Sequence, residues 1–235
     1  MSFLSLSTGD PAARDLLERA IRARYGLRPV PVESLRLWLS RPDKGPLGLP
    51  VQMHRTLSYT GATHWRQDDI SKLFGLTIRR FTTSFEPLAY YEQNGQNVRR
   101  LDDSDVRRAS RRFLWSHIAF MLTPLTMEGV TVNFVNETSF QAIRDADTTA
   151  VATISLDAND AVTVESEAYH PTTEKVTKFK LYGQGALRVL EGLTVPTQLV
   201  YQWGTEQPEA FTVTKVEVNP HLPKSQFALD EPAGQ

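Results

Sequence analysis

Charged side chains that could do chemistry are densest around residue 103. Asp102, Asp103 and Asp105 lie close together in the sequence, and carboxylates are the ligands that Mg²⁺ and Ca²⁺ prefer. The same residues stand where a helix is expected to begin, and there negative charge complements the helix dipole and caps free N–H groups. The segment lacks the further spaced oxygen ligands of an EF-hand. We therefore expect a helix cap here and no metal site.

Six arginines surround these aspartates and form the densest group of positive charge in the chain. On a helix, Arg108, Arg111 and Arg112 would share one face and could bind a phosphate or another anionic group by paired hydrogen bonds. Because three aspartates lie in the same stretch, a hydrated, salt-bridged face is the favoured interpretation. The alternative is an anion site at the mouth of a ligand cavity, formed by Arg108 or Arg112. The whole group is Arg99, Arg100, Arg107, Arg108, Arg111 and Arg112.

Motifs of known enzymes are missing from the sequence. The five histidines show no metal-ligand spacing, and His117 is expected to be a hydrogen-bonded core residue. Gly183 and Gly185 lack the third glycine of a dinucleotide loop and indicate a turn or a bulge. There is no nucleophile elbow, no P-loop and no cysteine. We expect no catalytic set, no metal and no cofactor, and an enzyme that uses His117 on a hydrophobic small molecule stays the open alternative.

The overall composition excludes several classes of partner. The chain has 235 residues, of which 26 are Lys or Arg and 27 are Asp or Glu, so the net charge is -1. This balance predicts no general attraction to nucleic acid, and no apolar run reaches the roughly 18 residues of a transmembrane helix. The start, residues 1–6, is too short for a signal peptide. We expect a cytoplasmic protein, or one of the periplasm or cell envelope if a leader was removed.

Two helices are expected to position these side chains. The first can be capped by Asp10, has Pro11 in its first turn and is followed by Gly26. The second follows residues 102–105, carries an apolar stripe that widens towards its end, and is closed by Pro124. Its arginine half is expected to be hydrated and its other half buried.

The remaining segments alternate apolar and polar residues, as strands of a half-buried sheet do. Before the second helix, an antiparallel meander of four strands is expected, with a hairpin at Asn94-Gly95. The expected strands are 34–40, 51–59, 76–85, 88–93, 130–136, 149–156, 161–168, 175–182, 185–190, 195–203 and 211–218.

Helix, strands, helix and strands in this order predict an α+β fold. We expect one domain over residues 1–235, with 229–235 as a loose tail. Its curved antiparallel sheet, an incomplete β-barrel, would wrap around two helices centred near Leu17 and Ile118.

Several short runs support a family resemblance over nearly the whole chain. They are Tyr25-Gly26, Leu122-Thr123-Pro124, the run Gly192-Leu193-Thr194-Val195-Pro196-Thr197, Asn219-Pro220 and Phe227. In this pattern the chain resembles the LolA-like family of outer-membrane lipoprotein-sorting proteins. The resemblance implies a half-barrel with an apolar cavity. Well-known members carry lipoprotein acyl chains across the periplasm, whereas others bind lipids, serve in envelope sensing or, in one pigment pathway, do chemistry.

The sequence and the resemblance together favour a non-catalytic protein that binds or carries a lipid, an acyl chain or another apolar ligand, with a lipoprotein as a further candidate partner. A protein-interaction module in envelope sensing is a second alternative beside the enzyme. The expected ligand contacts lie on the second helix and on the strands. They are Leu37, Leu39, Leu57, Tyr59, Phe81, Tyr90, Trp115, Phe120, Met121, Leu199, Tyr201 and Trp203.

Overall fold

The structure is a computed structural model and describes residues 7–45, 48–87 and 89–229. The expected loose tail is therefore almost wholly outside the described residues, which end at Leu229. The same holds for the start of the chain, and for Leu88, where the fourth strand was expected to begin.

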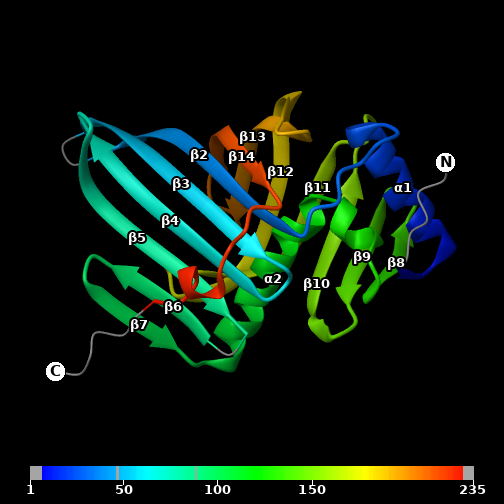
Figure 1. Ribbon diagram of the computed structural model, residues 1–235, viewed down its shortest axis with the longest axis horizontal. Helices are drawn as coiled ribbons and strands as arrows, with labels where there is room; N and C mark the ends of the chain where they lie inside the picture. Colours follow the sequence, from blue (N-terminus) through cyan, green and yellow to red (C-terminus); the bar gives the residue numbers. More distant parts are fainter. Residues whose placement is uncertain (1–6, 46–47, 88, 230–235) are drawn as a thin grey trace.

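Within these residues, fourteen strands form a single open sheet (Figure 1). The strand order is β1-β8-β9-β10-β11-β12-β13-β14-β2-β3-β4-β5-β6-β7. Only the short β1–β8 pair is parallel, and the other neighbours pair antiparallel. The strands are β1 (Thr8–Gly9), β2 (Ser34–Lys44), β3 (Pro50–Thr60), β4 (His64–Leu73), β5 (Leu76–Glu86), β6 (Ala89–Asn94), β7 (Asn97–Leu101), β8 (Val130–Asn136), β9 (Ser139–Arg144), β10 (Asp147–Leu156), β11 (Val162–His170), β12 (Lys175–Leu190), β13 (Leu193–Trp203) and β14 (Glu209–Val218).

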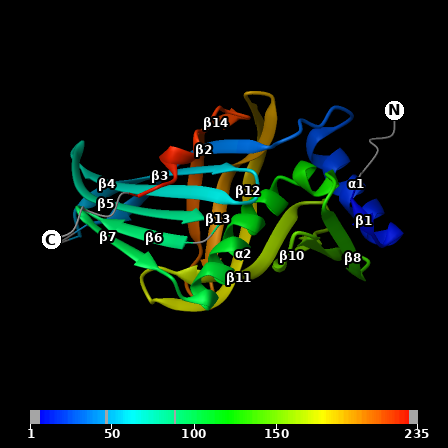
Figure 2. The ribbon, with the colours of Figure 1, turned by 60° about the horizontal axis from the view of Figure 1, so that its bottom comes forward.

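The two expected helices are present as α1 (Pro11–Tyr25) and α2 (Ser104–Phe120). Figure 2 shows α2 crossing the concave side of the curved sheet, whereas α1 lies at the end formed by β8 and β9. Leu17 and Ile118, the expected centres, are buried. The α+β fold with a curved, open sheet around helices is thus confirmed.

The helix ends differ from expectation in two places. Asp10 makes no capping hydrogen bond, because its Oδ2 instead accepts from the backbone N–H of Phe134 in β8. The second helix ends at Phe120, before Pro124: Leu122 already has a left-handed φ of 63°, and Pro124 lies in a short 3-10 helix, Thr123–Thr126. This turn seats the end of α2 beside α1, where the Tyr25 hydroxyl donates to the Met121 carbonyl at 2.8 Å.

Four strands were not expected: β1, β4, β7 and β9. Three of them are short, and β4 is polar over most of its length, so apolar alternation could not reveal it. By contrast, the two expected strands at 175–182 and 185–190 form one strand, β12. A register shift between Gln184 and Leu187 interrupts its pairing with β13, which confirms the bulge expected at Gly183 and Gly185.

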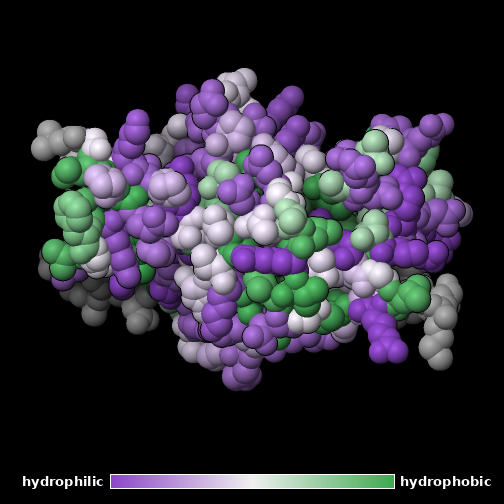
Figure 3. Space-filling view, turned by 90° about the horizontal axis from the view of Figure 1, so that it is seen from above, coloured by the Kyte–Doolittle hydropathy of each residue, from purple (hydrophilic) through white to green (hydrophobic). Residues whose placement is uncertain are grey.

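The β4–β5 hairpin ends in an exposed apolar tip. Phe74 and Leu76 are 80% and 74% exposed. Apolar residues gather at the corresponding end of the surface in Figure 3. The turn residues Phe74 and Gly75 have φ values of 50° and 84°. This two-residue turn with positive φ at both positions favours Asn and Gly, so a phenylalanine in it is unusual.

Candidate functional site

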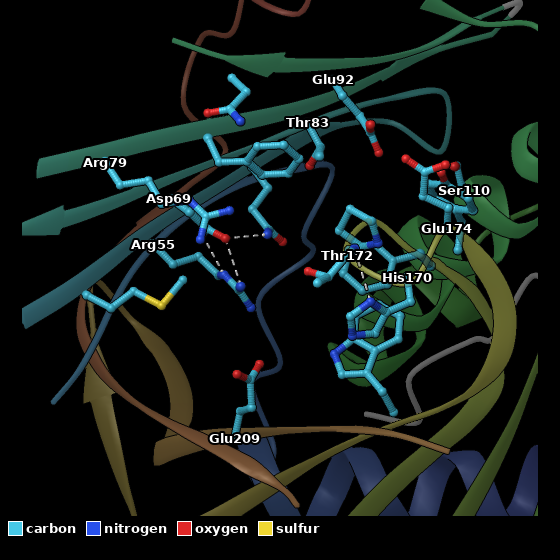
Figure 4. A pocket seen from close by; sticks show the side chains of 18 of the residues that line it. Arg55, Asp69, Arg79, Thr83, Glu92, Ser110, His170, Thr172, Glu174 and Glu209 are labelled. Atoms are coloured by element: carbon cyan, nitrogen blue, oxygen red, sulfur yellow. Dashed lines mark hydrogen bonds and ion pairs between the residues drawn. The ribbon is translucent and has the colours of Figure 1, made fainter. Parts of the chain in front are cut away.

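A cavity of about 680 Å³ opens on the concave side of the sheet, between α2, the strands β2 to β7 and the β11–β12 turn (Figure 4). Its size falls within the range of small-molecule sites, about 300 to 1,000 Å³. The lining residues on the strands are alternate ones, because successive side chains point to opposite faces. On β4 they are Trp65, Gln67, Asp69 and Ser71.

Strand register arranges these side chains in rows across the sheet. The innermost row is aromatic and consists of Tyr59, Trp65, Phe85 and Tyr90, of which Trp65 and Tyr90 line the cavity. The outermost row pairs Arg41, Met53, Ser71 and Arg79, and is mostly polar. The wall of the cavity therefore changes from aromatic near α2 to polar at its outer end.

Two rows lie between them, and the outer of these two contains a buried ion pair. Arg55 donates from Nε and Nη2 to the two carboxylate oxygens of Asp69, at 2.8 and 2.9 Å. Their side chains are 8% and 12% exposed. Burial works to lower the pKa of Arg55, but the adjacent Asp69 outweighs it and raises that pKa above its usual value. Arg55 therefore stays charged, and its charge is already neutralised by a protein carboxylate.

The other charged groups of the wall are also largely paired. Arg41 contacts Glu209 at 2.6 Å, and Arg99 contacts Glu92 at 2.6 Å and Glu174 at 2.9 Å. Burial raises the pKa of Glu92, and the hydrogen bond from Arg99 partly offsets this increase. Because these arginines already have carboxylate partners, the cavity has no strong net attraction for an anion.

The inner end of the cavity is a cluster of aromatic rings. The Phe113 ring, on α2, lies 5.2 Å from that of Trp65 and is stacked at 5.7 Å with that of Trp203. Tyr90 and Tyr169 pack edge to face at 5.5 Å. Faces of this kind bind apolar surfaces of a ligand.

Three of the twelve expected ligand contacts, Phe81, Tyr90 and Trp203, line this cavity. Four more lie on the same concave face of β2 and β3 but are packed in the core beside it. They are Leu37, Leu39, Leu57 and Tyr59. The other five are buried elsewhere in the core and do not line the cavity: Trp115, Phe120, Met121, Leu199 and Tyr201.

Arg108 and Arg112, the expected anion ligands, are not at the cavity. Arg108 pairs with Asp105 at 2.8 Å. Arg112 pairs with Glu167 and donates to the Thr149 carbonyl at 2.9 Å. These contacts confirm the salt-bridged face that the sequence favoured.

One of the three aspartates at the start of α2, Asp103, caps the helix as expected. The Asp103 side chain accepts hydrogen bonds from the N–H groups of Asp105 and Val106, at 2.8 and 3.1 Å. Over the described ranges, no group of His, Asp and Glu residues has the geometry of a metal site. In the same residues, no helix has the length and hydrophobicity to span a bilayer.

His117 is a core residue, as the sequence favoured. Its Nδ1 lies 2.9 Å from the Phe113 carbonyl, and its Nε2 lies 3.2 Å from the Tyr201 hydroxyl. Burial lowers the pKa of His117 to about 4, and the nearby charge of Arg55 acts in the same direction. The side chain is 1% exposed and does not line the cavity, so nothing in this geometry gives it access to a ligand there.

A solved structure with the same architecture supports the resemblance seen in the sequence. A LolA superfamily protein from Nitrosomonas europaea superposes with a TM-score of 0.50 at 8% identity, over 92% of this chain and 97% of that one. The fold is LolA-like. A domain described as an outer membrane lipoprotein-sorting protein, from Vibrio parahaemolyticus, covers 91% of the chain at 11% identity and a TM-score of 0.46.

At these identities the likeness concerns the fold alone. No family model matches the sequence, and no curated protein matches it. The chemistry of any ligand of this cavity therefore has to be argued from the residues of this chain.

The polar half of this cavity was not predicted from the sequence. Arg55, Gln67 and Asp69 occupy positions of strands where an apolar cavity would have Leu or Val. A signal was present, because Trp65, Gln67, Asp69 and Ser71 follow one another at every second position. That period indicates one face of a strand, but three of the four residues are polar, so the segment lacks the apolar alternation by which the other strands were predicted.

Proposed function

We propose that the protein is a non-catalytic binding or carrier protein for an amphipathic, lipid-like ligand held in the cavity on the concave side of the sheet. The observation that supports this function best is the change of the wall from aromatic to polar along β4. An apolar part of the ligand would pack at the inner end against Phe113 and Trp203. A polar part would lie among the ion-paired side chains.

The size and position of the cavity agree with this role. Its volume of about 680 Å³ suits a ligand the size of a small amphiphile. Burial of an apolar chain contributes about 0.8 kcal/mol for each CH₂ group, whereas an exposed ion pair contributes about 1 kcal/mol or less. Affinity would therefore come mainly from apolar contact, and orientation from the polar groups. We also propose that the protein acts in the cell envelope.

Native mass spectrometry of protein purified without detergent tests this function. Co-purified amphiphile, or uptake of a fluorescent fatty acid added afterwards, is the expected result. Protein that stays free of ligand and takes up no probe would contradict the proposal.

A pair of variants on one strand locates the binding. Phe81 lines the cavity, whereas Ile78 is exposed and does not line it. Phe81→Asp should therefore lower probe affinity at least tenfold, since it places a charge on the wall. Ile78→Asp, with the same change on β5, should leave affinity unaltered. Equal losses in the two variants would place the ligand elsewhere.

A further inference from the structure

Four residues that line the cavity carry a buried polar atom without a hydrogen-bond partner among the described residues: Nε of Arg41, Nε1 of Trp65, Oε1 of Gln67 and Oε1 of Glu92. Two of these atoms, Nε1 of Trp65 and Oε1 of Gln67, belong to uncharged side chains on one strand, β4. The two residues are 4% and 7% exposed. The amide orientation of Gln67 is fixed, because its Nε2 donates to Oδ2 of Asp69 at 3.0 Å. A buried polar atom without a partner is unfavourable, so this wall is suited to a ligand that supplies both partners.

The chemistry of these two atoms restricts what can lie against them. The indole N–H only donates, and an amide oxygen only accepts. They stand two residues apart on β4, so they lie on the same face of the strand. The matching group of a ligand must therefore accept one hydrogen bond and donate another within a short distance. Hydroxyl groups do both, whereas an alkyl chain does neither.

The side chains around these two atoms also favour a ligand with an apolar face. The ring of Trp65 itself belongs to the aromatic cluster with Phe113 and, through Phe113, with Trp203. A group that fits here combines flat apolar surfaces with a polar edge. The charged side chains nearby, Arg55 with Asp69 and Arg99 with Glu92, are paired with each other. A neutral polar group therefore fits better than a phosphate or a carboxylate.

We infer that the inner end of the cavity binds a saccharide ring. The C–H faces of a sugar would pack on the aromatic rings, and its hydroxyls would accept from Trp65 Nε1 and donate to Gln67 Oε1. The planar polar groups of Asp69, Arg55 and Glu92 would form hydrogen bonds with further hydroxyls of the sugar. The inference rests on the proposed function in one respect: the saccharide is the head group of the amphiphile. A free saccharide offers the same chemistry, and the test separates the two sources.

Isothermal titration calorimetry with matched small ligands provides the test. The ligands are octyl glycosides of glucose, galactose and mannose below their micelle concentrations, the corresponding methyl glycosides, and octanoate. At least one octyl glycoside should bind ten times or more tightly than octanoate. Its methyl glycoside should bind more weakly.

Three other results of the titration would contradict the saccharide inference, the proposed function, or both. Octanoate that binds as tightly as every octyl glycoside would overturn the saccharide inference and leave the proposed function standing. A methyl glycoside that binds as tightly as its octyl form would support the saccharide and contradict a lipid-like ligand. Absence of binding by all of them, together with ligand-free protein in the mass spectrum, would contradict the saccharide inference and the proposed function alike.

Removal of the donor atom alone tests the assigned contact. Trp65→Phe keeps an aromatic ring and deletes Nε1, which has no hydrogen-bond partner in the described part of the chain. Affinity for the best octyl glycoside should fall about tenfold, as expected for one hydrogen bond, and octanoate affinity should not change. Trp38→Phe, on the other face of the sheet, is the matched control. If Trp65→Phe folds poorly, the test uses Gln67→Met instead, because this change removes the hydrogen-bond acceptor. An unchanged glycoside affinity in a folded variant would overturn the assignment.

Discussion

Arg55 and Asp69 form a two-pronged ion pair on adjacent strands, with N–O distances of 2.8 and 2.9 Å, in the wall of the cavity. The pair lies on the concave face of β3 and β4, between the aromatic inner row and the polar outer row of the cavity wall. Burying two charges is unfavourable unless both stay paired. The pair is therefore expected to be sensitive to loss of either partner.

Asp69→Asn should lower the free energy of unfolding by about 3 kcal/mol, because the buried guanidinium of Arg55 loses its counter-charge. The control is Asp102→Asn, because Asp102 forms an exposed ion pair with Arg100. This variant should lower the free energy of unfolding by less than about 1 kcal/mol. Urea denaturation of the three proteins measures both effects. Similar losses in the two variants would show that burial of the Arg55 pair is not what matters.

His117 should make stability depend on pH on the acid side. The unfolded chain binds a proton there near pH 6.5, whereas the fold does so only near pH 4. Between these values the unfolded state binds more protons, so the free energy of unfolding falls as the pH drops. Glutamine does not titrate, so between pH 7.5 and 4.5 the free energy of unfolding of the His117→Gln variant should fall by about 2 kcal/mol less than that of the wild type. An identical pH profile in both proteins would contradict the buried, neutral state of His117.

Phe74→Asn should raise the free energy of unfolding by about 1 kcal/mol, because asparagine tolerates the left-handed conformation that phenylalanine adopts at this turn. Thermal denaturation is the measurement. Leu76→Asn is the control, since Leu76 is similarly exposed but lies in β5 rather than in the turn. A gain of the same size in the control would mean that removal of exposed apolar surface, and not relief of the turn, is responsible.

The sequence predicted those parts of the fold that depend on local signals. Pro11 and Gly26 mark the ends of α1, and the Asp103 cap marks the start of α2. The apolar stripes of the helices predicted which faces are buried. The hairpin turns after residues 94, 156 and 170 were equally visible in the turn residues themselves.

The cavity could not be predicted in the same way. Apolarity pointed to Leu57 and Tyr59, which fill the core beside it. The cavity wall uses Gln67 and Asp69 instead, and their burial depends on strands that meet only in the folded sheet. Polar residues on a strand look solvent-exposed in the sequence, so β4 was missed together with the half of the site that it forms.

Quenching of tryptophan fluorescence by dibromostearate can place the bound ligand, because bromine quenches an indole only at close range. Of the four tryptophans, Trp65 and Trp203 line the cavity, whereas Trp38 and Trp115 do not. We predict strong quenching in the wild type and almost none in the double variant Trp65→Phe, Trp203→Phe, with binding of the fatty acid to both proteins verified by native mass spectrometry. Undiminished quenching of the remaining Trp38 and Trp115 in the double variant would contradict a ligand site at this cavity.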